Sequence, residues 1–232
     1  MKSSVTAFFI LILTAATALA ADDSLKTPKD KLSYSIGMDI GGSLKQQAID
    51  IDPEILARGF QDVMKGDKTL LTRDEAVQVI TAFQQEMRAK IEAAKKTEGE
   101  KNKKEGEAFL AANKKKKGVK TTASGLQYKV IKEGTGAKPK ATETVSTNYK
   151  GTLIDGKEFD SSYKRGQPVS FPVNGVIAGW TEALQMMKVG SKWELVIPAN
   201  LAYGERGTGE NIGPNATLVF EVELLGIEAE KK

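Results

Sequence analysis

The chain has 232 residues, contains neither histidine nor cysteine, and carries a formal net charge of +4 at pH 7. The two missing residue types exclude disulfide bonds, cysteine nucleophiles, Ser-His-Asp triads and zinc enzymes with their usual ligands. We therefore expect no metal and no cofactor, and a stability that rests on hydrophobic burial in one or two domains.

The positive charge is concentrated in one segment of the chain. Residues 95–120 contain ten Lys and four Glu, a local charge of +6. A basic segment of this kind is more often the solvated face of a helix than a nucleic-acid patch. We do not expect nucleic acid as a partner.

Residues 1–20 have the pattern of a secretory signal peptide. Lys2 precedes an apolar run from Ala7 to Leu13, and Ala18-Leu-Ala matches a cleavage site. The apolar run is shorter than the roughly 20 residues that a membrane-spanning helix needs. The segment therefore predicts an exported protein without a membrane span.

The first predicted helix after this segment is amphipathic. Its apolar stripe recurs every four residues, at Leu32, Ile36, Ile40 and Leu44. Three glycines interrupt the stripe, at Gly37, Gly41 and Gly42. Each glycine costs a helix up to about 1 kcal/mol relative to alanine, so either another helix approaches closely here or the helix is broken. Both interpretations stay open.

Two further helices are predicted before residue 118. One begins at the N-cap Asp52 with Pro53 at its first position, and ends at Gly66. The other begins at the capping box Thr72 to Glu75 and meets no break until Gly118. If helical from Arg73 to Lys117, it would be about 65 Å long. Its apolar stripe fades after Ile91, so residues 92–118 are predicted to form a polar stalk without a core of its own.

Residues 21–91 are predicted to form an all-α homodimerisation domain. Two short amphipathic helices and one end of the stalk make a core smaller than a single chain usually needs. Pairing with a second copy would enlarge it. The alternative is that the same apolar stripes pack within one chain.

Residues 119–232 are predicted to form an α+β domain, because the apolar period becomes that of strands from Leu126 onward. The predicted strands are Leu126–Ile131, Thr144–Leu153, Val169–Val173, Lys192–Ile197 and Thr217–Ile227. Turn-forming clusters separate them, and one short helix follows Gly179. We expect an antiparallel sheet wrapped on that helix.

The segment from Gly151 to Lys157 fits most of a phosphate-binding loop. Glu158, however, stands where such a loop needs Ser or Thr to hold magnesium. Asp155-Gly156 lies between two predicted strands, which is typical of a hairpin. The hairpin is the better interpretation.

Six aromatic residues lie in or beside the apolar segments of this domain, at Tyr149, Phe159, Phe171, Trp180, Tyr203 and Phe220. Taken singly, each is most simply a core residue, and core is also the favoured interpretation of Trp180 at the start of its helix. Together with Asp160 and the loop after Tyr203, they would line a concave apolar pocket with few polar groups.

Five motifs in this half resemble successive motifs of the FKBP-type peptidyl-prolyl isomerases. They are Tyr149-Lys-Gly, Asp155-Gly-Lys-Glu-Phe-Asp-Ser-Ser, Val176-Ile-Ala-Gly-Trp, Ala202-Tyr-Gly and Ala216-Thr-Leu-Val-Phe. The helical half resembles the macrophage infectivity potentiator (Mip) group of that family. That second resemblance rests on Leu32-Ser-Tyr-Ser-Ile-Gly, Gly106-Glu-Ala-Phe-Leu and the join Ser124-Gly-Leu-Gln-Tyr-Lys-Val.

The resemblance implies a pocket with Trp180 as its floor. The catalytic residues that it implies are Tyr149, Phe159, Asp160, Trp180, Tyr203 and Phe220, and the substrate-binding residues are Phe171, Val176, Ile177 and Ile212. Asp160, the Tyr203 hydroxyl and the Ile177 backbone N–H would be the polar contacts. The loop from Thr208 to Asn211 departs from many relatives, which place a His and a second Ile there, so no preference for the residue before proline is predicted.

The function that the resemblance implies is an exported peptidyl-prolyl cis-trans isomerase of folding proteins, with chaperone activity. The implied location is the periplasm, with association with the outer membrane or cell surface left open. The alternatives are a dimeric chaperone, or a proline-binding module with little turnover. The implied partners are proline-containing polypeptides, a second copy of the chain, and macrolide inhibitors of the FK506 and rapamycin type.

Overall fold

The structure is a computed structural model that describes residues 25–228. The predicted signal peptide, residues 1–20, lies outside the described residues. The chain divides into two compact units, residues 1–73 and residues 74–232.

The described part of the first unit contains helices α1 (Pro28–Gln46) and α2 (Pro53–Lys65). α1 runs unbroken through its three glycines. The predicted bounds of α2 are confirmed: the Asp52 side chain accepts the first backbone N–H groups, and Gly66 ends the helix at φ 74°. Neither helix buries any residue. Their apolar faces instead line a groove of about 700 Å³ between them.

Helix α3 (Arg73–Asn113) carries the chain into the second unit. The long helix is confirmed, although it ends four residues before Lys117. Of its residues, Gly99, Gly106 and Asn113 are buried, so its C-terminal half is not a fully solvated stalk. The sequence did not indicate this packing because glycine and asparagine carry no hydrophobic signal. None of the described helices is long and apolar enough to cross a membrane.

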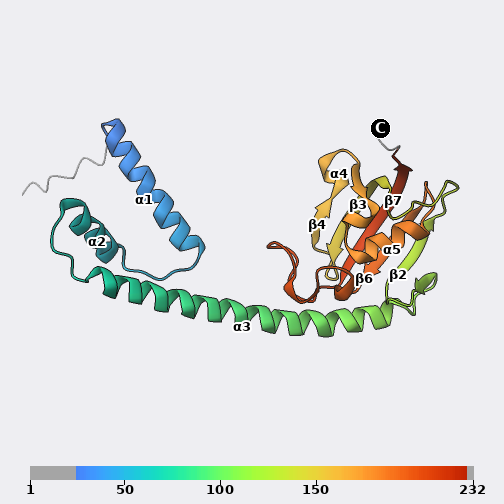
Figure 1. Ribbon diagram of the computed structural model, residues 1–232, viewed down its shortest axis with the longest axis horizontal. Coiled ribbons are helices and arrows are strands. Elements are labelled where there is room, and N and C mark those ends of the chain that lie inside the picture. The colour runs from blue at the N-terminus through green and yellow to red at the C-terminus, as the bar shows by residue number, and fades with distance from the viewer. Residues whose placement is uncertain (1–24, 229–232) are drawn as a thin grey trace, which may run out of the picture. The chain divides into compact units, whose positions relative to one another are not determined.

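The rest of the second unit is a seven-stranded sheet whose described strand pairs are all antiparallel (Figure 1). The strands are β1 (Val119–Thr121), β2 (Gln127–Lys132), β3 (Thr144–Leu153), β4 (Glu158–Ser161), β5 (Val169–Pro172), β6 (Lys192–Ile197) and β7 (Leu218–Ile227). Their order is β1-β2-β6-β7-β3-β4, and β5 also pairs with β3. The predicted α+β fold with an antiparallel sheet is therefore confirmed.

Two of these strands were not predicted. β1 and β4 have only three and four residues, too few for an alternating pattern to stand out. β4 pairs with β3 across the predicted hairpin, in which the N–H of Gly156 donates to the carbonyl of Leu153 over 3.0 Å. Glu158 thus follows a β-turn, and the segment is not a phosphate-binding loop.

The core lies between the sheet and helix α5 (Ala178–Met186). Ala183, Leu184 and Met187 are fully buried on the helix side. A Cβ at Gly179 would come within 2.5 Å of the Ile197 side chain on β6. This close approach lets the first turn of α5 lie against the sheet, and it places Trp180 at one end of the core.

Candidate active site

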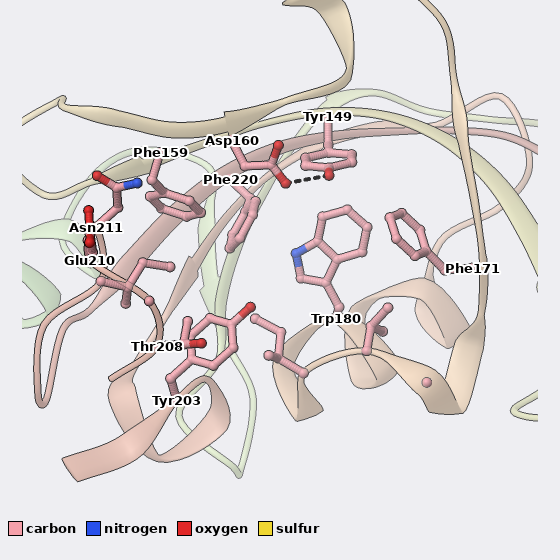
Figure 2. A pocket seen from close by; sticks show the side chains of 15 residues that line it. Tyr149, Phe159, Asp160, Phe171, Trp180, Tyr203, Thr208, Glu210, Asn211 and Phe220 are labelled. Atoms are coloured by element: carbon pink, nitrogen blue, oxygen red, sulfur yellow. Dashed lines mark hydrogen bonds between the residues drawn. The ribbon is translucent and has the colours of Figure 1, made fainter. Parts of the chain in front are cut away.

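One pocket of about 630 Å³ opens beside the first turn of α5. All ten site residues singled out in the sequence line it: Tyr149, Phe159, Asp160, Phe171, Val176, Ile177, Trp180, Tyr203, Ile212 and Phe220. They come from β3, β4, β5, the segment between β5 and α5, α5 itself, the loop before β7, and β7. Figure 2 shows the side chains that line the pocket. The pocket is also lined by Gly175 and by Thr208, Gly209, Glu210 and Asn211 of the loop after Tyr203, which the sequence had indicated as part of the lining.

Trp180 forms the floor and is only 4% exposed. Three aromatic rings meet its indole nearly at right angles: Tyr149 at a centroid distance of 5.2 Å, Phe220 at 5.3 Å and Phe171 at 5.9 Å. Edge-to-face pairs of this kind are favourable and directional. The floor is therefore a flat apolar surface that its neighbours hold in one orientation.

A second aromatic pair forms the wall between β4 and β7. The rings of Phe159 and Phe220 meet edge to face at a centroid distance of 5.5 Å. Gly151 lies behind them on β3, where a Cβ would come within 2.7 Å of both rings. Any larger residue at this position would push the wall into the pocket.

The polar side of the pocket is a network of three side chains. The Tyr149 hydroxyl donates to Asp160 Oδ2 over 2.6 Å and accepts from Arg165 Nη2 over 2.7 Å. Arg165 also forms an ion pair with Asp160, and its guanidinium lies 5.4 Å from the centre of the Tyr149 ring. Asp160 is thereby fixed at the edge of an otherwise aromatic cup.

Sequence reasoning missed Arg165, which follows Asp160 by five residues. The short helix α4 (Ser162–Arg165) returns it to the pocket, with Ser161 as N-cap and Gly166 at φ 73° after its last residue. The available signal was chemical, since a carboxylate at an apolar pocket needs a cation or donors nearby. Nothing in the periodicity showed which of the neighbouring basic residues would supply it.

The network shifts the pKa values of its members. Burial, and next the hydrogen bond to Asp160, raise the pKa of Tyr149 to about 12. Burial opposes ionisation of Asp160, but the hydrogen bonds from Tyr149 and Arg165 outweigh it and hold the pKa of this carboxyl below its usual value. Burial and the nearby Asp160 charge raise the pKa of Tyr203. At neutral pH, Asp160 is therefore ionised and both tyrosines are protonated.

The pocket rim is a tight loop after Tyr203. Thr208 and Ile212 pair across it: the Thr208 N–H donates to the Ile212 carbonyl over 2.8 Å, and the Ile212 N–H donates back over 3.3 Å. Ile212 is buried in the core, whereas Glu210 and Asn211 are exposed at the tip. The rim thus presents one apolar residue inward and polar residues outward.

Two family models match the chain. Residues 29–130 match the domain amino terminal to FKBP-type peptidyl-prolyl isomerase, and residues 135–225 match the FKBP-type peptidyl-prolyl cis-trans isomerase itself. Among solved structures, FkpA from Escherichia coli aligns with a TM-score of 0.66 and 42% identity, covering 88% of this chain and 99% of that chain.

Close relatives match over the full length. The outer membrane protein MIP of Legionella longbeachae is 50% identical over 230 residues, covering 98% of this chain and 99% of that protein. The peptidyl-prolyl cis-trans isomerase Mip of Coxiella burnetii is 43% identical over 228 residues, with the same coverage of 98% and 99%. These matches confirm the resemblance to the Mip group. The chain belongs to the FKBP-type peptidyl-prolyl cis-trans isomerases.

Proposed function

We propose that the protein rotates X–Pro bonds of exported polypeptides in the pocket above Trp180. The observation that carries the proposal is the cup of edge-to-face aromatic rings, closed on one side by the fixed, ionised Asp160. In the productive pose the proline ring lies flat on the Trp180 indole. Asp160, the Tyr203 hydroxyl and the Ile177 N–H hold the carbonyl groups on either side of the rotating bond.

The chemistry needs no acid, base or nucleophile. Rotation of a peptide bond crosses a barrier of about 18–20 kcal/mol, most of which is lost amide resonance. The twisted amide is less charge-separated than the planar one, so an apolar cup stabilises it relative to the ground state. Tyr149 and Arg165 contribute by fixing Asp160, since a carboxylate that had to reorganise would stabilise the twisted state less.

The rate should be independent of pH between about pH 5 and pH 9, because no described pocket group with a shifted pKa titrates there. The Asp160 pKa is lowered in the folded state, so its ionised form stabilises the fold above the unfolded-state pKa of about 3.9. That stability is lost as the pH falls through the folded-state pKa. Two-dimensional NMR exchange on an X–Pro peptide measures the rate directly at each pH. The control is the exchange rate of the same peptide without protein in the same buffers.

A bell-shaped profile with an inflection near pH 6 or 7 would contradict this proposal. It would mean that a proton is transferred in the rate-limiting step. The chain has no histidine to supply such an inflection.

The protein acts as a homodimer in this proposal, joined through α1 and α2. These helices leave large apolar side chains in water, among them Phe60 at 61% exposed, and the groove between them is lined by Ile36, Ile40, Leu44, Leu56 and Phe60. Gly37 and Gly41 line the same groove, and a Cβ on either would meet nothing within 4 Å in the single chain. A helix from a second copy would cover this face and use the close approach that the glycines permit.

Phe60→Glu should convert the dimer into a monomer, because it buries a carboxylate in the interface without a partner. Arg58→Glu is the matched control, since Arg58 is exposed on the same helix and does not line the groove. Light scattering at micromolar concentration should give the dimer mass for the wild type and for Arg58→Glu. A monomer mass for the wild-type chain would refute the dimer.

Export and inhibition by macrolides are the last parts of this proposal. The relative from Legionella longbeachae is named an outer membrane protein, and residues 1–20 have the pattern of a signal peptide. Both observations support export, and in this proposal the protein meets proline-containing chains in the periplasm as they fold. Macrolides of the FK506 and rapamycin type would compete for the same aromatic pocket.

A further inference from the structure

One face of the C-terminal half of α3 is buried against the sheet domain. Gly99, Gly106 and Asn113 lie seven residues apart and are the buried residues of the helix, and Asn102 between them is partly buried. Residues three, four and seven apart lie on one face of a helix. This contact face contains small and polar residues, whereas a solvated stalk would have no buried face at all.

The contact face lies against the chain between the pocket rim and β7. A Cβ at Gly99 would come within 3.1 Å of Pro214 Cβ, and a Cβ at Gly106 within 2.4 Å of Thr217 Oγ1. A side chain at position 106 would therefore collide with Thr217 unless one of the two moved, and a side chain at position 99 would make an unusually tight contact with Pro214. Figure 1 shows the same segment, in the red part of the chain before β7, running beside α3.

Hydrogen bonds fix the register of this contact. Asn102 Nδ2 donates to the Pro214 carbonyl over 2.9 Å, and Asn215 Nδ2 donates to the Gly99 carbonyl over 3.3 Å. At the end of α3, Gln127 Nε2 donates to the Leu110 carbonyl over 3.0 Å, and buried Asn113 donates to Gln127 Oε1 over 3.0 Å. Amide side chains thus hold the helix at both ends of the face, where they fix both its distance and its rotation.

The segment under α3 is continuous with the pocket on both sides. Pro214 follows the rim residue Ile212 by two positions, and Phe220 follows Thr217 by three. The N–H of Asn215 donates to the Gly204 carbonyl over 2.8 Å, directly after Tyr203. Any shift of Pro214 would therefore reach the rim residue Ile212 through one intervening residue, and any shift of Asn215 would reach Gly204, next to Tyr203, through one hydrogen bond.

We propose that the stretch of α3 from Gly99 to Asn113 is a positioning element of the active site, which holds Tyr203 and the Thr208–Ile212 rim in place through Pro214, Asn215 and Thr217. The inference rests on the proposed function of the pocket. It assigns to the helix a role in substrate binding. The functional isomerase domain would then begin at about Glu98, and not at residue 119 as the sequence predicted.

Gly106→Leu in the otherwise intact protein should raise KM and lower kcat/KM about tenfold, because a leucine there pushes α3 away from Thr217 and releases the rim. The matched control is Ala108→Leu, which adds the same side chain to an exposed position of the same helix. The control should stay within about twofold of wild type. Both are measured by NMR exchange at a temperature where circular dichroism shows the fold to be intact.

A milder pair keeps the test valid if Gly106→Leu does not fold. Gly106→Ala brings its Cβ to 2.4 Å from Thr217 Oγ1, and Thr217→Ala removes that oxygen. The double variant should recover most of the kcat/KM that Gly106→Ala loses. Amide chemical shifts from Tyr203 to Ile212 should change in Gly106→Ala and return in the double variant.

Unchanged kcat/KM and unchanged rim shifts in a folded Gly106→Leu protein would overturn the inference. So would equal losses in Gly106→Leu and Ala108→Leu, which would show an effect on the helix alone. The shifts are independent of turnover, so a wild-type protein without isomerase activity would refute the proposed function while the shift changes still test the role of α3.

Discussion

Tyr203→Ala should reduce kcat/KM for an X–Pro peptide by about 10- to 100-fold, because it removes one wall of the pocket and a hydroxyl that positions the substrate. Tyr203 is 39% exposed, so its removal leaves the core intact. The free energy of unfolding should change by less than about 1 kcal/mol. The loss is therefore expected in activity, not in folding.

Tyr163→Ala is the matched control for this variant. Tyr163 is 46% exposed, similar to Tyr203, and it lies on α4 outside the pocket. Its loss should leave kcat/KM within about twofold of wild type. Similar activities for the two variants, measured by NMR exchange under the same conditions, would mean that Tyr203 has no part in the reaction.

Trp180→Leu and Trp193→Leu should separate the two tryptophans of the chain. Both indoles are buried, and each has an aromatic partner: Trp180 meets three rings at the pocket floor, whereas Trp193 stacks on Tyr128 at a centroid distance of 4.5 Å, outside the pocket. Each replacement should lower the free energy of unfolding by about 2–4 kcal/mol, since it removes a large buried side chain. Only Trp180→Leu should also lower kcat/KM, by about tenfold.

Denaturant unfolding gives the two stability losses, and exchange rates at a temperature where both variants are folded give the two activities. An equal fall in activity for both variants would assign the effect to general loosening of the core. Full activity in Trp180→Leu would show that the proline ring does not rest on this indole.

The aromatic residues of the pocket were predictable from sequence because they lie in clearly apolar segments. Phe171, Trp180 and Phe220 each stand in an apolar segment, so the fold brings them together once the sheet forms. Those patterns alone favoured a core position for each residue taken singly. The motifs around Asp155 to Ser162 and Val176 to Trp180 indicated the pocket instead, because they resemble a known family.

The strands, too, were predictable where their apolar pattern is strong. β3 and β6 match their predicted bounds because both show clear strand patterns. β1 and β4 are shorter than any reliable period, and their pairing depends on β2 and β3 being in place. Tertiary context, not local propensity, forms these two strands.

Arg165 and the contact face of α3 depend on geometry that no sequence period encodes. Arg165 reaches Asp160 through a single turn of helix, and Gly99 and Gly106 matter because of the side chains that they lack. A glycine at regular spacing in a polar helix indicates a loose helix as readily as a close contact. The partner that distinguishes the two lies more than 100 residues away along the chain.

The central claim is that this pocket catalyses rotation of the X–Pro bond and does not merely bind proline. The most direct measurement is two-dimensional NMR exchange between the cis and trans signals of an X–Pro peptide, with a catalytic amount of the protein after EDTA treatment. We expect a large rise in the exchange rate over that of the peptide alone, and no loss of this rise after EDTA treatment. An exchange rate equal to that of the free peptide, in a sample whose chemical shifts show the peptide bound at Trp180, would contradict it.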